Sequence, residues 1–253
     1  YENALVLHYA PISLIGNSIS TAAFPRLTDR LAQGRVDLFR KEFVMVLRTM
    51  IWIALPVVVV SFFARAYLAR IIFARSSSEI AMIFGFLCVA IFFRIIYTII
   101  SRYFYAHKDT KTPLYVSLFV IALNIYLAYT LSKPTAYGVA GLAIAQSIVA
   151  LTEVMILVVI MIRRDRKLFT RDFLQAVTRM VAITGFTAVA TYITIQYFPL
   201  LQSDIGSVLV AKLIIIAAVT FTVHTAMSYI FDMPEAKTVV RKAKNMALAV
   251  IKV

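Results

Sequence analysis

One run of polar residues lies inside a long apolar stretch of the sequence. Arg94 stands among isoleucine and phenylalanine residues, where a charge costs about 2.5–3.5 kcal/mol if the stretch crosses a membrane. Thr98, Ser101 and Arg102 follow at helical spacing and extend one cationic stripe. Because a guanidinium binds phosphate through paired hydrogen bonds, this stripe predicts an anion-binding surface facing a hydrated cavity. Pairing of Arg94 with Glu153, or snorkelling to an interface, is the alternative.

A second polar stripe lies near the start of the sequence. Its members are small residues at i, i+4, i+7 and i+8, namely Ser13, Asn17, Ser20 and Thr21. Small hydroxyl residues often only tighten helix packing in membranes. Because Pro11 and Gly16 lie beside this stripe, we expect it to line a cavity. The isolated polar residues Asn124, Gln146 and Glu153 are expected to form hydrogen bonds between helices.

The sequence lacks the residue spacings of an enzyme or a metal site. There is no glycine-rich phosphate loop, no Ser/His/Asp arrangement and no Cys/His cluster. His8 and His224 have no companions at metal-ligand spacing, and Cys88, the one cysteine, lies in an apolar run. We therefore expect no catalytic residues, no bound metal and no cofactor. A transport or structural role is favoured over catalysis.

The elements that hold these polar stripes are predicted to be membrane-spanning helices. The 253 residues are 62% hydrophobic and 15% charged, with a mean hydropathy of +0.87, whereas soluble domains are about half apolar and a quarter charged. Crossing the hydrocarbon takes about 20 apolar residues. Seven segments qualify, of which the first is the weakest: 3–24, 43–64, 80–105, 114–131, 137–162, 174–198 and 207–231. The fold class is therefore all-α, a polytopic membrane protein with seven transmembrane helices.

Positive charge is concentrated on one side of these segments. Most of the 26 Lys and Arg residues fall in four regions, 26–48, 102–111, 163–171 and 236–253. The opposite side holds Arg65, Arg70, Arg75, Lys133 and Lys212. By the positive-inside rule the basic side is cytoplasmic, which also places the C-terminus there. The net charge of +14 thus predicts orientation and attraction to anionic membrane lipids, with no nucleic acid as a partner. The basic loop 26–48 is expected to form a partly amphipathic surface helix.

Two motifs resemble a known family of membrane proteins. The first motif contains Pro11, Gly16, Pro25 and Arg26, and the second contains Tyr105, Asp109, Thr112 and Pro113. Both are similar to motifs of the MurJ/MviN peptidoglycan lipid II flippases, within the multidrug/oligosaccharidyl-lipid/polysaccharide exporter superfamily. The resemblance implies a fourteen-helix fold made of two six-helix lobes and two further helices. The seven segments would be its second lobe plus the two C-terminal helices.

This correspondence divides the chain into three regions. Residues 1–162 would form five transmembrane helices of the C-lobe, with the basic cytoplasmic loop 26–48. Residues 163–235 would form the two additional helices, and residues 236–253 a basic cytoplasmic tail. Because the sequence begins at Tyr1 and not at Met, we expect the N-terminal lobe to lie upstream in the same protein.

The resemblance also implies a substrate and a mechanism. The cargo would be an undecaprenyl-pyrophosphate-linked peptidoglycan precursor, lipid II, in the bacterial inner membrane. Its headgroup would pass from the cytoplasmic to the outer leaflet by alternating access. One departure from the family concerns an Asp-Arg pair of helix eight, whose positions hold Leu5 and Val6 here. Arg94 is a candidate substitute for that arginine. Two alternatives stay open, an ion-coupled drug or polysaccharide exporter of the same superfamily and a non-transporting membrane scaffold.

Overall fold

The computed structural model describes residues 1–73, 77–237 and 241, and within these residues every regular element is a helix. In chain order they are α1 (Glu2–Pro11), the π-helix η1 (Ile12–Asn17), α2 (Ser18–Ala32), α3 (Val36–Phe63), α4 (Arg65–Ile72), α5 (Ser77–Ala106), α6 (Lys111–Leu131), α7 (Val139–Arg164), α8 (Arg171–Tyr197) and α9 (Gly206–Ile230). Arg75 and most of the predicted tail 236–253 lie outside the described residues.

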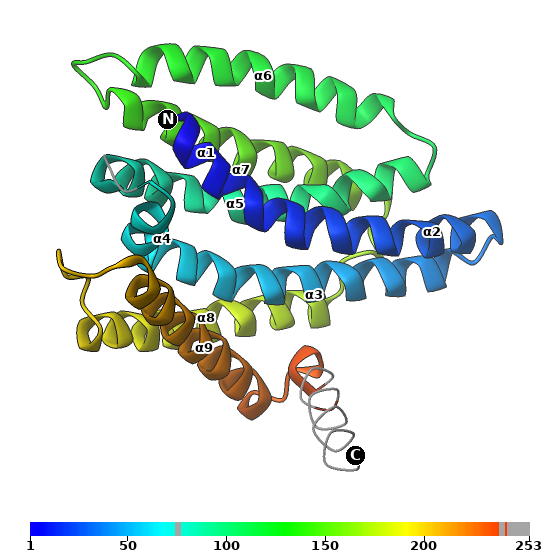
Figure 1. The fold of residues 1–253 in the computed structure, drawn as a ribbon. Helices are drawn as coiled ribbons and strands as arrows, with labels where there is room; N and C mark the ends of the chain where they lie inside the picture. The colour runs from blue at the N-terminus through cyan, green and yellow to red at the C-terminus, as the bar shows by residue number, and fades with distance from the viewer. Residues whose placement is uncertain (74–76, 238–240, 242–253) are drawn as a thin grey trace.

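Six helices are long and apolar enough to cross a membrane: α3, α5, α6, α7, α8 and α9. They coincide with six of the seven predicted segments. The remaining one, 3–24, falls in a helical run that the π-helix divides into α1, η1 and α2, each shorter than a span. This run lies beside α3 and α5 (Figure 1). Its crossing of the membrane stays a prediction.

The prediction of a surface helix over 26–48 is wrong, because this region is a helical hairpin. The helix α2 ends in a Schellman turn, in which Arg35 N–H bonds to Arg30 O at 2.9 Å and Gly34 N–H to Leu31 O at 3.0 Å. Gly34 has φ +70°, a left-handed conformation that glycine adopts without strain. The chain then enters α3 at Val36. The basic residues of 26–48 are therefore distributed over the ends of two long helices.

The helix α5 lies at the centre of the bundle. It packs against α1, η1 and α2 on one side, and against α3, α4 and α7 on the others. The share of the apolar span that is buried is 61% in α5 and only 11% in α6, which packs mainly on α7 at one edge. The hairpin of α8 and α9 covers α3 at the other edge (Figure 1). The sequence is apolar on the outer faces of these edge helices because lipid, and not protein, surrounds them.

The connections between helices emerge at two opposite ends of the bundle (Figure 1). The α2–α3, α5–α6 and α7–α8 connections lie together at one end, here called the basic end. The helix α4 and the α6–α7 and α8–α9 connections lie at the other, here called the outer end. The predicted basic loops thus share one end of the molecule, as alternating crossings require.

Candidate functional site

The arginine inside α5 is paired. Arg94 Nη1 donates to Glu153 Oε2 of α7 at 2.7 Å, and Ser117 of α6 donates to Glu153 Oε1 at 3.0 Å. The Glu153 side chain is only 3% exposed, so this pair joins three helices deep in the lobe. Asn124 donates to Gln146 at 2.9 Å between α6 and α7, which confirms both as interhelical partners. The pairing alternative for Arg94 is thus what the structure contains.

The rest of the α5 stripe lies along the first helical run. The hydroxyl of Thr98 bonds to the carbonyl of Ile95 at 2.7 Å, and that of Ser101 to the carbonyl of Thr98 at 3.0 Å. The guanidinium of Arg102 lies 5.1 Å from the centre of the Phe24 ring. The two hydroxyls are therefore satisfied within α5, and Arg102 contacts the first helical run through an aromatic ring.

Gly16 sets the distance between the first helical run and α5. It is buried in η1, and a Cβ atom at this position would lie 3.1 Å from Thr98 Cγ2 and 3.4 Å from Ile95 Cα. A small residue lets two helices approach closely in a membrane. This motif residue therefore has a packing role that the structure shows directly.

The predicted polar stripe of the first run divides between two faces. Ser13, Asn17 and Thr21 are exposed, whereas Ser20 is buried. The π-helix Ile12–Asn17 has more than 3.6 residues per turn and so shifts the register of the residues after it. We call the three exposed residues the outer polar face. Because a polar row does not face hydrocarbon favourably, it is the best candidate here for a cavity wall.

The position that the resemblance assigns to the family arginine is on the surface of α1. Val6 is 59% exposed. His8 of the same helix is buried, and neither ring nitrogen has a hydrogen-bond partner among the described residues. His224 of α9 is also buried and faces Thr187, with Oγ1 and Nδ1 3.3 Å apart. Cys88 is buried in the core, as predicted.

The second motif fixes the turn between α5 and α6. Asp109 Oδ1 accepts the backbone N–H of Thr112 at 3.0 Å, and Oδ2 accepts the Thr112 hydroxyl at 2.6 Å. Arg164 at the end of α7 donates to Asp109 Oδ2 and to Thr112 Oγ1. The bonds from Thr112, helped by Arg164, lower the pKa of Asp109 to about 2. Pro113 lies in the first turn of α6, where its missing N–H costs nothing. The carbonyl of Tyr105 accepts the N–H of Lys108 in the same turn.

The first motif has a comparable local role. Pro11 ends α1 where η1 begins, and Pro25 lies inside α2. The carbonyl that Pro25 retains accepts the Thr28 hydroxyl at 2.7 Å. Arg26 lies 3.6 Å from Glu42 of α3, across the α2–α3 hairpin. The motif residues thus shape this hairpin and the π-helix before it.

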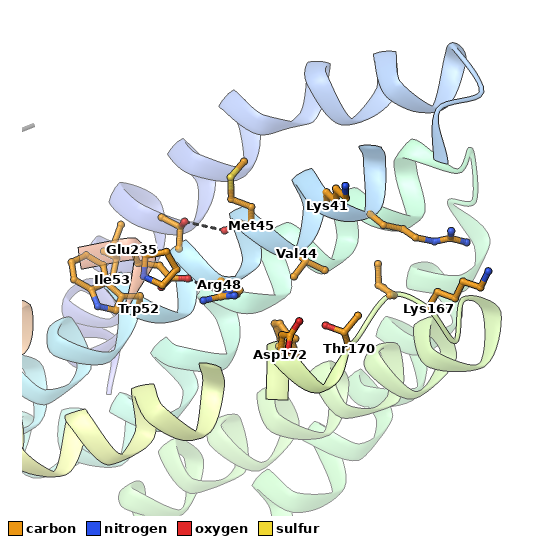
Figure 2. Close-up of a pocket in the computed structure, with 15 residues that line it drawn as sticks. Lys41, Val44, Met45, Arg48, Trp52, Ile53, Lys167, Thr170, Asp172 and Glu235 are labelled. Atoms are coloured by element: carbon orange, nitrogen blue, oxygen red, sulfur yellow. Dashed lines mark hydrogen bonds and ion pairs between the residues drawn. The ribbon is translucent and has the colours of Figure 1, made fainter. Parts of the chain in front are cut away.

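Sequence reasoning did not predict a cavity of about 660 Å³ at the basic end. It lies between α3, the start of α8 and the residues that follow α9 (Figure 2). Its lining residues come from three regions that are far apart in the sequence, 40–53, 167–173 and 234–235. The signal available in the sequence was Arg48, a charge inside an apolar helix.

The sequence and fold were compared with known proteins. Residues 1–214 match the family model described as "Lipid II flippase MurJ". The chain is 24% identical over 211 residues to the probable lipid II flippase MurJ of Borreliella burgdorferi, which covers 81% of this chain and 40% of the relative. It is 27% identical over 202 residues to the probable lipid II flippase MurJ of Synechocystis sp., covering 75% of this chain and 36% of the relative.

The fold is also that of a solved structure. Lipid II flippase MurJ in an inward closed conformation aligns with a TM-score of 0.72 and 22% identity, over 90% of this chain and 45% of that one. This chain therefore spans less than half the length of each of these relatives. Since the family model matches residues 1–214, a range that includes both motifs described above, the chain belongs to the MurJ family of lipid II flippases.

Proposed function

We propose that the protein containing this chain moves lipid II from the cytoplasmic to the outer leaflet by alternating access. The observation that carries this proposal is the family match over residues 1–214. The relatives are more than twice as long as the matched region, which supports a second, N-terminal lobe in the same protein. The basic end would face the cytoplasm, together with the C-terminus.

The outer polar face supports a cavity between two lobes. Ser13, Asn17 and Thr21 point away from the helices described here, on a helical run that has α3 and α5 behind it. Hydroxyl and amide groups can bond to sugar hydroxyls and phosphate oxygens without a fixed charge. A lobe packed against this face would enclose a polar space large enough for a hydrated headgroup. The acyl chain of the cargo would stay in lipid.

The function is tested by complementation in a strain depleted of its own flippase. The full-length protein is expected to restore growth and to move lipid II in inverted vesicles. Replacement of the outer polar face by leucine, in S13L/N17L/T21L, should abolish both while membrane insertion stays normal. The matched control Q175L/T178L/T222L changes three exposed polar residues on α8 and α9 and should keep both activities.

Arg94 is proposed to contribute to headgroup binding, and its pairing makes a sharper test possible. Arg94→Ala leaves Glu153 as a buried unpaired charge, which by itself costs stability. The double variant R94A/E153A removes both charges. If the double variant restores flipping, Arg94 serves only to neutralise Glu153. If flipping stays lost while the folded protein is recovered in normal amount, the guanidinium contributes to transport.

The scaffold alternative is favoured by one specific observation. The family arginine position is Val6, and the substitute Arg94 is neutralised by Glu153 at 2.7 Å. A non-transporting protein would insert normally, fail to complement, and tolerate S13L/N17L/T21L. An ion-coupled exporter would instead confer drug efflux without moving lipid II. Complementation and lipid II movement therefore separate a flippase from both alternatives, and a drug-efflux assay separates the exporter from the scaffold.

A further inference from the structure

The cavity at the basic end combines apolar walls with a charged rim. Most of its apolar side chains come from α3 and α8, among them Val44, Met45, Trp52, Ile53 and Phe173. Lys41 of α3 and Lys167 of the α7–α8 connection both lie towards one side of it, and Glu235 lies beside Trp52 on the other (Figure 2). Asp172 and Thr170 lie between them. Charged tips above an apolar floor are typical of the level where lipid headgroups meet acyl chains.

The carboxylate of Glu235 is only half satisfied. Arg48 Nε donates to Glu235 Oε1 at 2.7 Å, and the Glu235 side chain is 7% exposed. The other oxygen, Oε2, is buried and has no hydrogen-bond partner among the described residues. A buried acceptor without a donor is costly, so such an atom indicates a missing hydrogen-bond donor.

The two lysines on the opposite side of the cavity lack an anionic partner in the described part of the chain. Within residues 1–73 and 77–237, neither Lys41 nor Lys167 takes part in an ion pair. Arg40, which also lines the cavity, is already paired with Asp165 at 2.6 Å. The cavity therefore offers two free cations at one side and one free carboxylate oxygen at the other.

We propose that this cavity binds a resident phospholipid whose headgroup carries a phosphate and a primary ammonium, a phosphoethanolamine lipid. Lys41 and Lys167 would hold the phosphate as point charges. The ammonium would donate to Glu235 Oε2, with Asp172 nearby, and the glycerol and acyl chains would pack on the apolar walls. The lipid would fasten α3 to the α8–α9 hairpin. This site is separate from the proposed path of the cargo along the outer polar face.

The site would distinguish lipids by the hydrogen-bond donors of their headgroups as well as by their net charge. A choline headgroup has the same phosphate and the same positive charge but no N–H group, so it cannot satisfy Glu235 Oε2. A glycerol headgroup has hydroxyl donors but no ammonium.

The full-length protein, purified without substrate, is therefore offered ethanolamine, choline and glycerol phospholipids of equal chain length, and bound lipid is counted by native mass spectrometry.

The wild-type protein is expected to retain the ethanolamine lipid roughly tenfold more than the choline lipid, as one charge-assisted hydrogen bond implies. Glu235→Gln should reduce that ratio to about one. Because Glu235→Gln leaves Arg48 unpaired, the double variant R48M/E235M, which removes the whole pair, is measured beside it and should show the same loss. K41Q/K167Q should lower retention of all three lipids. The control K108Q/K111Q, with the same charge change at the same end, should match the wild type.

Several results would overturn the assignment. Equal retention of the ethanolamine and choline lipids by the wild type removes the role of Glu235. Preferred retention of the glycerol lipid shows that the site selects negative charge instead. Unchanged retention in K41Q/K167Q shows that the phosphate is held elsewhere. None of these readouts depends on transport, so failure of this proposal and failure of the proposed flippase function are distinguishable.

Discussion

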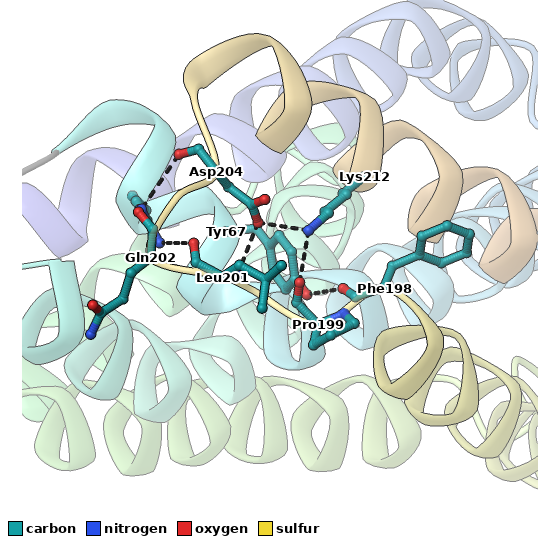
Figure 3. A network of polar contacts seen from close by, with 8 residues as sticks. Tyr67, Phe198, Pro199, Leu201, Gln202, Asp204 and Lys212 are labelled. Atoms are coloured by element: carbon teal, nitrogen blue, oxygen red, sulfur yellow. Dashed lines mark hydrogen bonds and ion pairs between the residues drawn. The ribbon is translucent and has the colours of Figure 1, made fainter.

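At the outer end, the α8–α9 turn is fastened to α4 by side chains that bind its backbone, whereas at the basic end the start of α8 and the residues after α9 border a cavity with unpaired charges. Figure 3 shows the outer contacts and Figure 2 the cavity. Both ends contain arginine, lysine and carboxylate groups. The difference lies in whether the protein itself supplies each partner.

The outer contacts form a closed set, here called the latch. Tyr67 OH donates to the carbonyl of Phe198, and Arg70 donates to the carbonyls of Leu201 and Gln202 at 2.7 and 2.5 Å (Figure 3). From α9, Lys212 donates to the Pro199 carbonyl at 2.8 Å and to Asp204 Oδ2 at 2.7 Å. Asp204 Oδ2 also accepts the N–H of Leu201 at 3.0 Å.

The outer end shows how side chains of neighbouring helices hold a short loop at a membrane surface. Residues 198–205 have no regular structure of their own, so side chains of α4 and α9 must satisfy their carbonyls. At the basic end side chains also hold the backbone of the connections, as Asp109 and Asp165 do. Lys41 and Lys167 at the cavity, however, have no ion-pair partner among the described residues. The first group of predictions concerns the closed outer end, where the expected effects are larger.

The largest effect is expected at the outer end, where the first turn of α7 packs directly against the backbone at the end of α6. A Cβ atom on Gly141, in the first turn of α7, would lie 2.0 Å from the carbonyl oxygen of Leu131 at the end of α6. Backbone must move to admit it, so Gly141→Ala should cost at least the about 1–3 kcal/mol typical of overpacking. Gly185→Ala in α8 is the control, because nothing lies within 4 Å of its Cβ. Thermal unfolding in detergent should fall for the first variant and not for the second.

The next effect concerns the latch. Arg70→Ala removes the donor for three loop carbonyls, those of Leu201, Gln202 and Asp204, so hydrogen exchange of residues 200–205 should accelerate several-fold, with α3 and α5 unchanged. Arg70→Lys should restore only part of the protection, because one ammonium cannot reproduce the two-pronged geometry. Arg65→Ala is the matched control, since Arg65 donates to Phe62 within its own segment. Equal acceleration in the Arg65 variant would contradict a specific latch.

The sequence was sufficient to predict the spans but not their internal register. Length and hydropathy predict six helices correctly because lipid-facing segments must be long and continuously apolar. The π-helix after Pro11 was missed, since counting at 3.6 residues per turn groups Ser20 with Ser13 and Asn17. One extra residue in a turn is enough to move Ser20 to the buried face. Gly34 was the available signal for the hairpin that replaces the predicted surface helix.

The candidate site, too, could be predicted from the sequence only in part. A buried arginine in a span must have a partner or water, which is why both alternatives for Arg94 could be written from the sequence. Choosing between them required the distance to Glu153, 59 residues away in the chain. Spacing could not predict the cavity, because Lys41, Lys167 and Glu235 are far apart in the sequence and line one cavity only through the packing of α3, the start of α8 and the residues after α9. Sequence spacing carries no information about such contacts.

At the basic end a smaller effect is expected from the motif aspartate. Asp109→Ala removes the cap of α6 and a partner of Arg164, and the loss of a helix cap costs about 1 kcal/mol. The start of α6 should fray, seen as faster hydrogen exchange of residues 111–114. Asp29→Ala, an exposed carboxylate on α2 near the same end, should have no such effect. If Asp109→Ala leaves α6 protected, the motif is not held by this contact.

The smallest effect is expected on hydrogen exchange of the α8–α9 loop when the pH is lowered. Lys212 and the N–H of Leu201 hold the pKa of Asp204 below its ordinary value. A carboxyl group whose pKa is lower in the folded protein contributes stability that is complete above its unfolded value, about 3.9, and is lost as the pH falls through the folded value. Between pH 8 and pH 5, exchange of residues 199–205, corrected for its intrinsic rate, should therefore stay constant. Below about pH 4 it should accelerate. In Asp204→Asn that acid acceleration should be absent, because the charge that holds Lys212 is already gone. Acceleration near pH 6.5 in the wild type would instead assign the latch to a histidine, which none of its contacts contains.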